Sequence, residues 1–249
     1  MAISNAEPPG LVDLHCHLLW DVDDGCRGPE DSLSAAKALA AVGYRAAAQT
    51  PHARADFPSQ DASLCEERLR ALVALLESEG VPLELHRGAE NVLDEAFLER
   101  VGRGEPRALG PAGRYVLVEL PFAGSVPQLP NLLFRIRLKG LVPLLAHPER
   151  CSEFERPGRA EESARLGAAL QLDFGALIGR YGRVARKLAE RFLAEGLYGV
   201  AATDLHGPVE AERWIKEALA ALEKKAGSAE ARRLCRENPR RVLAGEELL

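Results

Sequence analysis

The sequence lacks the features of a membrane-bound, secreted or nucleic-acid-binding protein. Among its 249 residues, no stretch approaches the roughly 18 apolar residues that a membrane-spanning helix needs, and the first ten residues do not resemble a secretory signal. Five cysteines form no C-x-x-C pair, and the net charge of -5 includes no long basic block. These absences argue against a disulfide framework and a DNA-binding surface. We therefore expect a cytoplasmic protein without membrane insertion or a nucleic-acid partner.

No glycine-rich phosphate loop follows the first apolar run, which disfavours an open dinucleotide-binding sheet. Seven short apolar runs predict strands, and segments of helical period separate them; the runs lie at 11–15, 44–49, 83–87, 115–120, 141–146, 169–173 and 198–203. None of these runs alternates cleanly, so both faces of the sheet are expected to be covered, as in parallel α/β folds. The pattern predicts one barrel domain over residues 11–249, after a flexible tail at 1–10.

Histidines and carboxylates lie at or just beyond the carboxyl ends of the predicted strands. These residues are His15, His17, His52, Glu90, Glu119, His147, Asp204 and His206. In a β/α barrel all such ends open onto one face, so these side chains would meet in one cleft.

Each histidine taken alone is more simply a hydrogen-bonded core residue than a metal ligand. The joint pattern favours a metal site, because His15 and His17 are two residues apart on one strand and project from the same face. Glu119, in its apolar YVLVE context, would be costly to bury without a partner or an ion. His86 lies inside its run and is expected to be structural. Asp13 is expected to orient a ligand histidine, and Asp173 to cap a loop.

The motifs HCH (15–17), VDDG (22–25), TPH (50–52), VELPF (118–122), HPER (147–150) and TDLH (203–206) together resemble the PHP superfamily. Within it they are most similar to the bacterial protein-tyrosine phosphatases of capsule and exopolysaccharide biosynthesis. The resemblance implies a distorted seven-stranded β/α barrel with three divalent ions. The implied ligand sets are His15, His17, Glu90 and Asp204 for one ion, Glu90, Glu119 and His147 for the second, and Asp24, His52 and His206 for the third.

Imidazole and carboxylate ligands without thiolate suit manganese, iron or zinc, and manganese is the first expectation. We expect a metal-bound hydroxide to attack phosphorus directly. Arg150 would grip the phosphate, and Asp204 or His206 would help to protonate the departing phenolate. The resemblance implies the phosphotyrosine tail of a bacterial tyrosine kinase as substrate. The sequence does not indicate an oligomeric state.

Three other functions are compatible with parts of the pattern. They are a PHP phosphoesterase acting on histidinol phosphate or nucleotides, an amidohydrolase with a bridging lysine, and a regulator that binds phosphotyrosine without hydrolysing it. Cys235 and Arg241 have the spacing of thiol phosphatases, but CRENPRR has no glycine for an amide nest around phosphate. Ala211 stands where some relatives have arginine, and the nearest arginine is Arg213. The residues after His52 lack the second histidine common in this family, so Arg54 is a candidate for contact with substrate or only with solvent.

Overall fold

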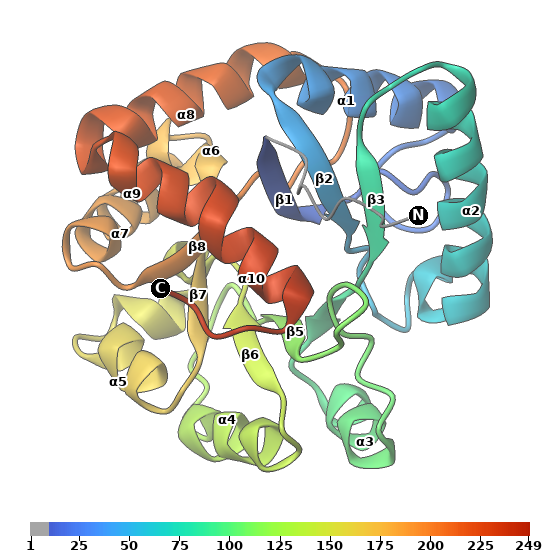
Figure 1. Cartoon of the computed structure of the whole chain (residues 1–249). Helices are drawn as coiled ribbons and strands as arrows, with labels where there is room; N and C mark the ends of the chain where they lie inside the picture. The colour runs from blue at the N-terminus through green and yellow to red at the C-terminus, as the bar shows by residue number, and fades with distance from the viewer. Residues whose placement is uncertain (1–9) are drawn as a thin grey trace, which may run out of the picture.

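The computed structural model describes residues 10–249, so all of the predicted tail except Gly10 lies outside the described residues. Strands and helices alternate along the chain (Figure 1). The strands are β1 (Leu11–Cys16), β2 (Tyr44–Gln49), β3 (Glu84–Arg87), β4 (Glu90–Val92), β5 (Tyr115–Glu119), β6 (Val142–Leu145), β7 (Ala169–Asp173) and β8 (Tyr198–Ala202).

The α-helices follow the strands in the expected β/α order. They are α1 (Pro29–Val42), α2 (Ala62–Ser78), α3 (Glu95–Arg103), α4 (Leu129–Leu138), α5 (Arg159–Arg165), α6 (Phe174–Leu177), α7 (Gly182–Ala194), α8 (Ala211–Ala226), α9 (Ser228–Arg232) and α10 (Asn238–Ala244). Short helical turns are η1 (Pro58–Gln60), η2 (Pro148–Arg150), η3 (Ser152–Glu155) and η4 (Arg233–Glu237). Within residues 10–249, none of these helices combines the length and the apolar character needed to cross a bilayer.

All strand pairs are parallel, and they form two sheets of order β1-β2-β3 and β4-β5-β6-β7-β8. Two isolated bridges join these sheets: Cys16 pairs with Leu205, and His52 pairs with Glu90. Most helices lie around the outside of the strands, whereas α10 crosses one end of them (Figure 1). Tyr115, at the start of β5, donates its hydroxyl hydrogen bond to the Glu246 carbonyl, so α10 and the tail after it cover the amino ends.

The stretch around residue 88 differs from the prediction, because the chain there forms two strands instead of one. A Cβ at Gly88 would lie 2.8 Å from Leu109 and 3.2 Å from the Gln49 carbonyl oxygen. At this close approach the chain stops pairing with β2, which ends β3. Two residues later it pairs with β5 as the short strand β4. The parallel α/β barrel architecture is confirmed, with one additional short strand.

Apolar side chains pack on both faces of the strands. The larger cluster joins the sheets to the surrounding helices, for example through Leu39 of α1 and Ile215 of α8. The smaller cluster joins the strands to α10 through Leu14, Leu144 and Val242. Burial on both faces explains why the strand sequences show no alternation of apolar and polar residues.

Candidate metal centre

His15 and His17, at the end of β1, project to one point, as their two-residue spacing predicts. Their Nε2 atoms lie 3.2 Å apart. Asp13 does not contact either ring; it accepts hydrogen bonds from the backbone N–H groups of His15 and Thr203. It therefore fixes the main chain that carries His15, and the ring is oriented by another residue.

Two carboxylates, one on β4 and one in the loop after β8, complete the first group of candidate ligands. The Nε2 atom of His15 lies 3.3 Å from Oε2 of Glu90 and 3.1 Å from Oδ1 of Asp204. His17 Nε2 is 3.5 Å from each of the same oxygens. All four side chains are buried, and their ligand atoms lie within 4.8 Å of one another. This group is the expected first ligand set.

The structure also forms two overlapping groups of candidate ligands. One contains His17, Asp24, His52 and His206, and the other contains His52, Glu90 and Glu119. His17 is thus an additional member of the expected third set, and His52 takes the place expected for His147 in the second. His147 remains beside that group, with Nε2 3.0 Å from Oε1 of Glu90 and 4.0 Å from Oε1 of Glu119. All nine expected ligands therefore converge on one cluster.

The hydrogen bonds of three rings show which nitrogen is free to bind a cation. The Nδ1 atoms of His15, His17 and His206 lie 2.9, 2.8 and 2.9 Å from oxygens that can only accept. Those oxygens belong to Gln171, Asp23 and the Asp204 backbone. Each Nδ1 therefore carries the hydrogen, and in the neutral ring Nε2 directs its lone pair into the cluster, as a metal-ligating histidine requires.

Gln171 and Asp23 are functional positions that the sequence analysis did not identify. Gln171 lies on β7, two residues before Asp173, and Asp23 lies beside the expected ligand Asp24 in an acidic loop. The position of Gln171 near a strand end was the available signal. The sequence alone does not distinguish Asp23 from Asp24, since both are carboxylates in the same turn.

Buried polar atoms without hydrogen bonds provide a test of whether cations fit this site. Oε2 of Glu90, Oδ1 of Asp204 and Nδ1 of His52 are buried, and none makes a well-aligned hydrogen bond within residues 10–249; the His52 nitrogen lies 2.9 Å from Oε2 of Glu90. Leaving such groups unsatisfied costs free energy. Because these carboxylate oxygens face imidazole nitrogens, a divalent cation between them would satisfy both, and the residues present therefore fit a metal cluster.

The charged groups also shift one another's pKa values. Burial alone would lower the pKa of His15, but the carboxylates of Glu90 and Asp204 outweigh it and raise the pKa to about 10. Burial likewise opposes the shift at His52, where Asp24 and Glu90 raise the pKa to about 11. The carboxylates thus draw positive charge into the site, either as protons or as cations.

Arg150 lies beside the cluster, on η2 directly after His147. Its Nη1 donates hydrogen bonds to Asp173 at 3.1 Å and to Asp204 at 2.6 Å. The guanidinium lies 4.8 Å from the ring centre of Phe122 and 4.1 Å from that of Tyr181. Nη1 is used in these two hydrogen bonds, whereas Nε and Nη2 make none with the described residues. Arg150 is thus held in place and can donate two hydrogen bonds to an anion.

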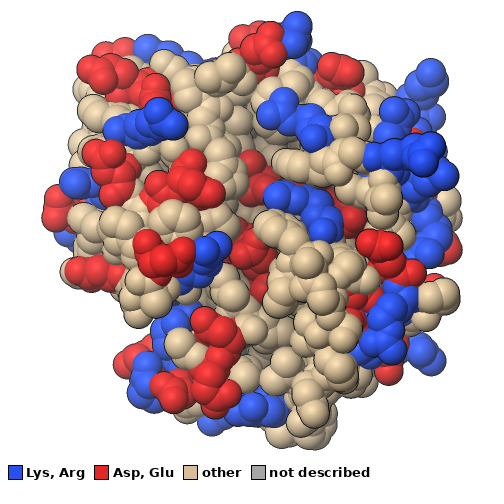
Figure 2. All heavy atoms as spheres, turned by 180° about the vertical axis from the view of Figure 1, so that it is seen from behind, with Lys and Arg blue, Asp and Glu red and all other residues tan. Residues whose placement is uncertain are grey.

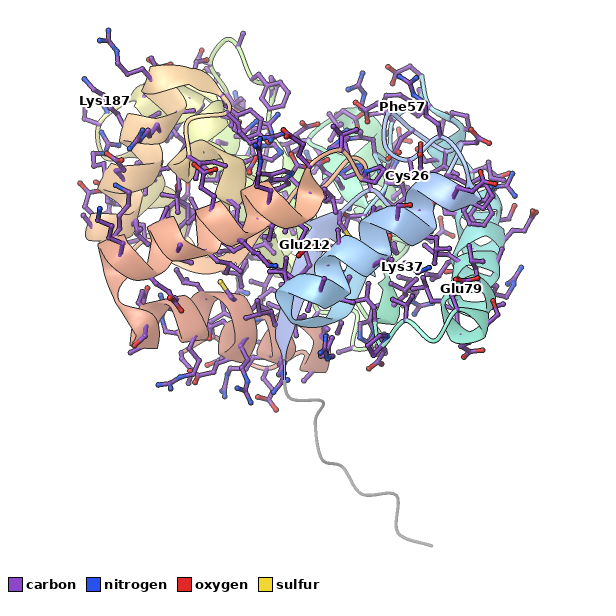
Figure 3. All side chains as sticks on the ribbon, turned by 90° about the horizontal axis from the view of Figure 1, so that it is seen from above. Cys26, Lys37, Phe57, Glu79, Lys187 and Glu212 are labelled. Carbon is purple, nitrogen blue, oxygen red and sulfur yellow. The ribbon has the colours of Figure 1, made fainter. Side chains whose placement is uncertain are left out.

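The cluster opens to the face of the molecule opposite α10. Basic and acidic side chains surround a hollow near the centre of that face (Figure 2). A pocket of about 440 Å³ there is lined by Arg150, Asp204 and His206, among others. Phe57, which stacks on His52 with ring centres 5.5 Å apart, lies in the loop after β2 (Figure 3). A substrate can therefore reach the candidate ligands from solvent.

The other sequence candidates are not members of the ligand groups. His86 on β3 is 3.4 Å from Glu84 and joins no ligand group. Arg54 and Arg213 pair with Asp56 and Glu210 on the surface. Asp173 caps α6 by accepting from the Gly175 N–H, as expected for a capping residue.

The rival chemistries find no support in the geometry. Cys235 is buried in η4 without an amide nest, and burial raises the pKa of its thiol well above the usual value. A thiolate nucleophile needs the opposite shift. The six lysines, at 37, 139, 187, 216, 224 and 225, lie in helices or directly after one and not at a strand end, where an amidohydrolase would place its bridging lysine.

A parallel β/α barrel with histidines and carboxylates gathered at the carboxyl ends of its strands defines the class of metal-dependent barrel hydrolases. The phosphotriesterase homology protein of Escherichia coli shares this fold, with a TM-score of 0.61, 14% identity and coverage of 94% of this chain and 98% of that chain. Residues 11–244 match the model of the capsular polysaccharide synthesis family CpsB/CapC. The chain belongs to the CpsB/CapC family.

Similar members of this family are named tyrosine-protein phosphatases. YwqE of Bacillus subtilis is 30% identical over 219 residues, which cover 88% of this chain and 86% of YwqE. CpsB of Streptococcus pneumoniae is 28% identical, with coverage of 94% and 98%. A crystal structure from the study of YwqE and CpsB, described as unique metal-dependent tyrosine phosphatases, has a TM-score of 0.87 and 28% identity, and covers 96% of each chain.

Proposed function

We propose that this chain is a metal-dependent protein-tyrosine phosphatase of capsule or exopolysaccharide biosynthesis. The observation that supports this most is the convergence of three overlapping ligand groups beside an arginine, at the open end of the barrel. The names of the family members give the same activity. Phosphomonoester hydrolysis needs both charge neutralisation and an activated water, and such a site can supply both.

We propose three divalent ions, with manganese as the first candidate and iron or zinc as alternatives. Their ligands would be His15, His17, Asp24, His52, Glu90, Glu119, His147, Asp204 and His206. When bound, clustered divalent ions lower the pKa of a water molecule and neutralise the charge of a phosphate. The nitrogen and oxygen donors suit these metals, and the described cluster contains no cysteine.

Around these ions, the chain's own residues position the substrate. Arg150, fixed by Asp173 and Asp204, would donate two hydrogen bonds to phosphate oxygens through Nε and Nη2. Phe122 is 48% exposed at the same edge, so its ring can pack against the tyrosine ring. Asp204 and His206 face the pocket, where one of them would help to protonate the phenolate.

The proposed substrate is a protein phosphotyrosine, in particular the tail of a bacterial tyrosine kinase in the cytoplasm. The whole of residues 11–249 would act as one phosphatase domain. Histidinol phosphate or a nucleotide is the alternative substrate class for this site. A regulator that only binds phosphotyrosine is the non-catalytic alternative, and the presence of every expected ligand residue argues against it.

A substrate panel tests the proposal. The manganese-loaded protein is assayed for phosphate release from a phosphotyrosine peptide, a phosphoserine peptide, histidinol phosphate and a nucleoside monophosphate. We expect the phosphotyrosine peptide to be hydrolysed with the highest kcat/KM. Preference for either small phosphate would support the alternative phosphoesterase, and phosphotyrosine binding without turnover would support the regulator.

A further inference from the structure

A second arginine lines the pocket that holds Arg150. Arg180 lies in the turn between α6 and α7, and Trp214 lies in the first turns of α8; both border the pocket of about 440 Å³. The Arg180 guanidinium lies over the Trp214 ring, 4.7 Å from its centre. This position is next to the candidate metal site but outside the three ligand groups.

The turn that carries Arg180 is held firmly. The backbone N–H of Arg180 donates to the Gly175 carbonyl at 2.9 Å, and Gly179 and Gly182 flank the turn with positive φ angles of 82° and 87°. Trp214 itself is only 6% exposed, so it provides a fixed apolar surface under the guanidinium. A cation held in this way loses little conformational freedom when it binds an anion.

Arg180 has no acidic partner within the described residues 10–249. Arg54, Arg186 and Arg213, which are also exposed, each pair with a carboxylate of the chain. Arg150 in the same pocket contacts two carboxylates. An exposed arginine that is positioned by stacking but not neutralised is suited to bind an anion from another molecule.

The geometry points to Arg180 as a specificity-determining residue that binds the carboxylate of an acidic side chain close to the phosphotyrosine in the substrate. This inference rests on the proposed function for the phosphate site itself. The phosphate would lie at the metal cluster and Arg150, and neighbouring substrate residues would extend along the pocket towards Trp214. Each residue of an extended peptide spans about 3.3–3.6 Å, so an acidic residue next to the phosphotyrosine or one further along would come within reach of Arg180.

Binding of two non-hydrolysable peptides tests this inference. Both contain phosphonomethyl-phenylalanine in place of phosphotyrosine. In one peptide the two residues before it and the two residues after it are glutamates, and in the other these four residues are glutamines. The manganese-loaded wild-type protein should bind the glutamate peptide about tenfold more tightly, as expected for one charge-assisted pair. Arg180→Gln should bind both peptides with the affinity that the wild type has for the glutamine peptide.

Arg183→Gln is the matched control, because Arg183 is an exposed arginine on α7 that does not line the pocket. It should keep the tenfold preference. The inference is overturned if the wild type does not distinguish the peptides, or if Arg180→Gln keeps the preference. Hydrolysis of a phosphotyrosine peptide by the same preparations tests the proposed function separately, because its failure would leave the binding comparison interpretable.

Discussion

Two candidate ligands have backbone conformations that side-chain-bearing residues rarely adopt. His147 has a φ of 32° and Asp204 a φ of 52°, both in the left-handed region. Such conformations cost on the order of 1–3 kcal/mol each, and they persist where the surroundings hold them. At Asp204, the backbone N–H donates to the His15 carbonyl at 2.8 Å, which ties this ligand to the strand of two others. The side chains of both residues reach the cluster, where Asp204 lies 3.1 Å from His15 and His147 lies 3.0 Å from Glu90.

Replacing His147 tests the cluster at the level of one side chain. His147→Ala removes a candidate ligand beside Glu90 and should nearly abolish turnover of a phosphotyrosine peptide, with lower metal content by elemental analysis. His86→Ala, on β3 and outside the ligand groups, should retain both activity and metal. Substantial metal-dependent activity in His147→Ala would contradict the assignment.

Arg150→Lys tests whether the proposed binding of phosphate by Arg150 depends on its positive charge alone or also on the shape of the guanidinium group. Lysine keeps the positive charge but loses the two-donor fork and the stacking between Phe122 and Tyr181. We expect kcat/KM for phosphotyrosine peptides to fall by about a hundredfold, as when a donor to a transition state is lost. Arg186→Lys is the control, since Arg186 on α7 pairs with Glu190 on the surface and should stay near wild-type activity. An unchanged kcat/KM in Arg150→Lys would show that charge alone suffices.

The sequence indicates the candidate ligands more readily than the residues that support them. His15 and His17 were predictable, because their spacing places both on one side of a strand end. Asp24 needed the family resemblance, since Asp23 is the same residue type in the same turn. Gln171 and Asp23 contact histidine rings only through the three-dimensional fold. The position of Gln171 near a strand end was a signal of this contact, whereas nothing distinguished Asp23 from Asp24.

At the scale of helices and strands, the core-forming segments were predictable and the short ones were not. Seven strands have apolar runs long enough to recognise, whereas β4 has three residues, one of them the buried carboxylate Glu90. At the end of the chain α9, η4 and α10 follow one another without a loop, and Pro239 lies in the first turn of α10.

A buried carboxylate links the loop after β5 to α5. Glu153 accepts a hydrogen bond from the Val126 N–H at 2.7 Å and pairs with the Arg159 guanidinium. Burial alone would raise the pKa of Glu153, but these partners outweigh it and hold the pKa below its usual value. The ionised carboxylate therefore stabilises the fold above the ordinary glutamate pKa of about 4.3, and this stabilisation is lost as the pH falls through the lower folded-state pKa.

Glu153→Gln should lower the free energy of unfolding by about 3 kcal/mol at neutral pH, because it leaves Arg159 without its buried partner. The difference from the wild type should shrink as the pH falls below about 4.3. Urea unfolding at a series of pH values measures both effects. Lys37→Gln, which breaks a surface pair with Glu79 between α1 and α2 (Figure 3), should cost less than about 1 kcal/mol. An equal cost for the two variants would contradict the role of Glu153.

At the scale of the whole molecule, the candidate ligands come from both sheets. His15, His17 and His52 lie on or directly after β1 and β2, whereas Glu90, Glu119 and Asp204 belong to the second sheet or the loop after it. Buried carboxylates close to one another repel when no cation is present. Metal binding should therefore stabilise the entire barrel and not only the site.

Removing metal with a chelator tests this coupling. Manganese at a hundred times its dissociation constant should add about 2.7 kcal/mol per site, which raises the Tm of a domain of this size by about 5–10 °C. Differential scanning calorimetry of the chelated protein, before and after manganese is added back, measures the shift. Glu90→Gln should lose most of the shift and His86→Ala should keep it. The same Tm with and without manganese would contradict the prediction.

The two isolated bridges between the sheets occur at the candidate ligands themselves. One links Cys16, between His15 and His17, to Leu205, between Asp204 and His206; the other links His52 directly to Glu90. Each of the two junctions between the sheets is thus hydrogen-bonded at the point where a cation would bind. Separating the sheets at either junction would move the candidate ligand atoms apart. Loss of the ions and opening of the barrel should therefore occur as one cooperative event, and the ions should dissociate only when the barrel opens.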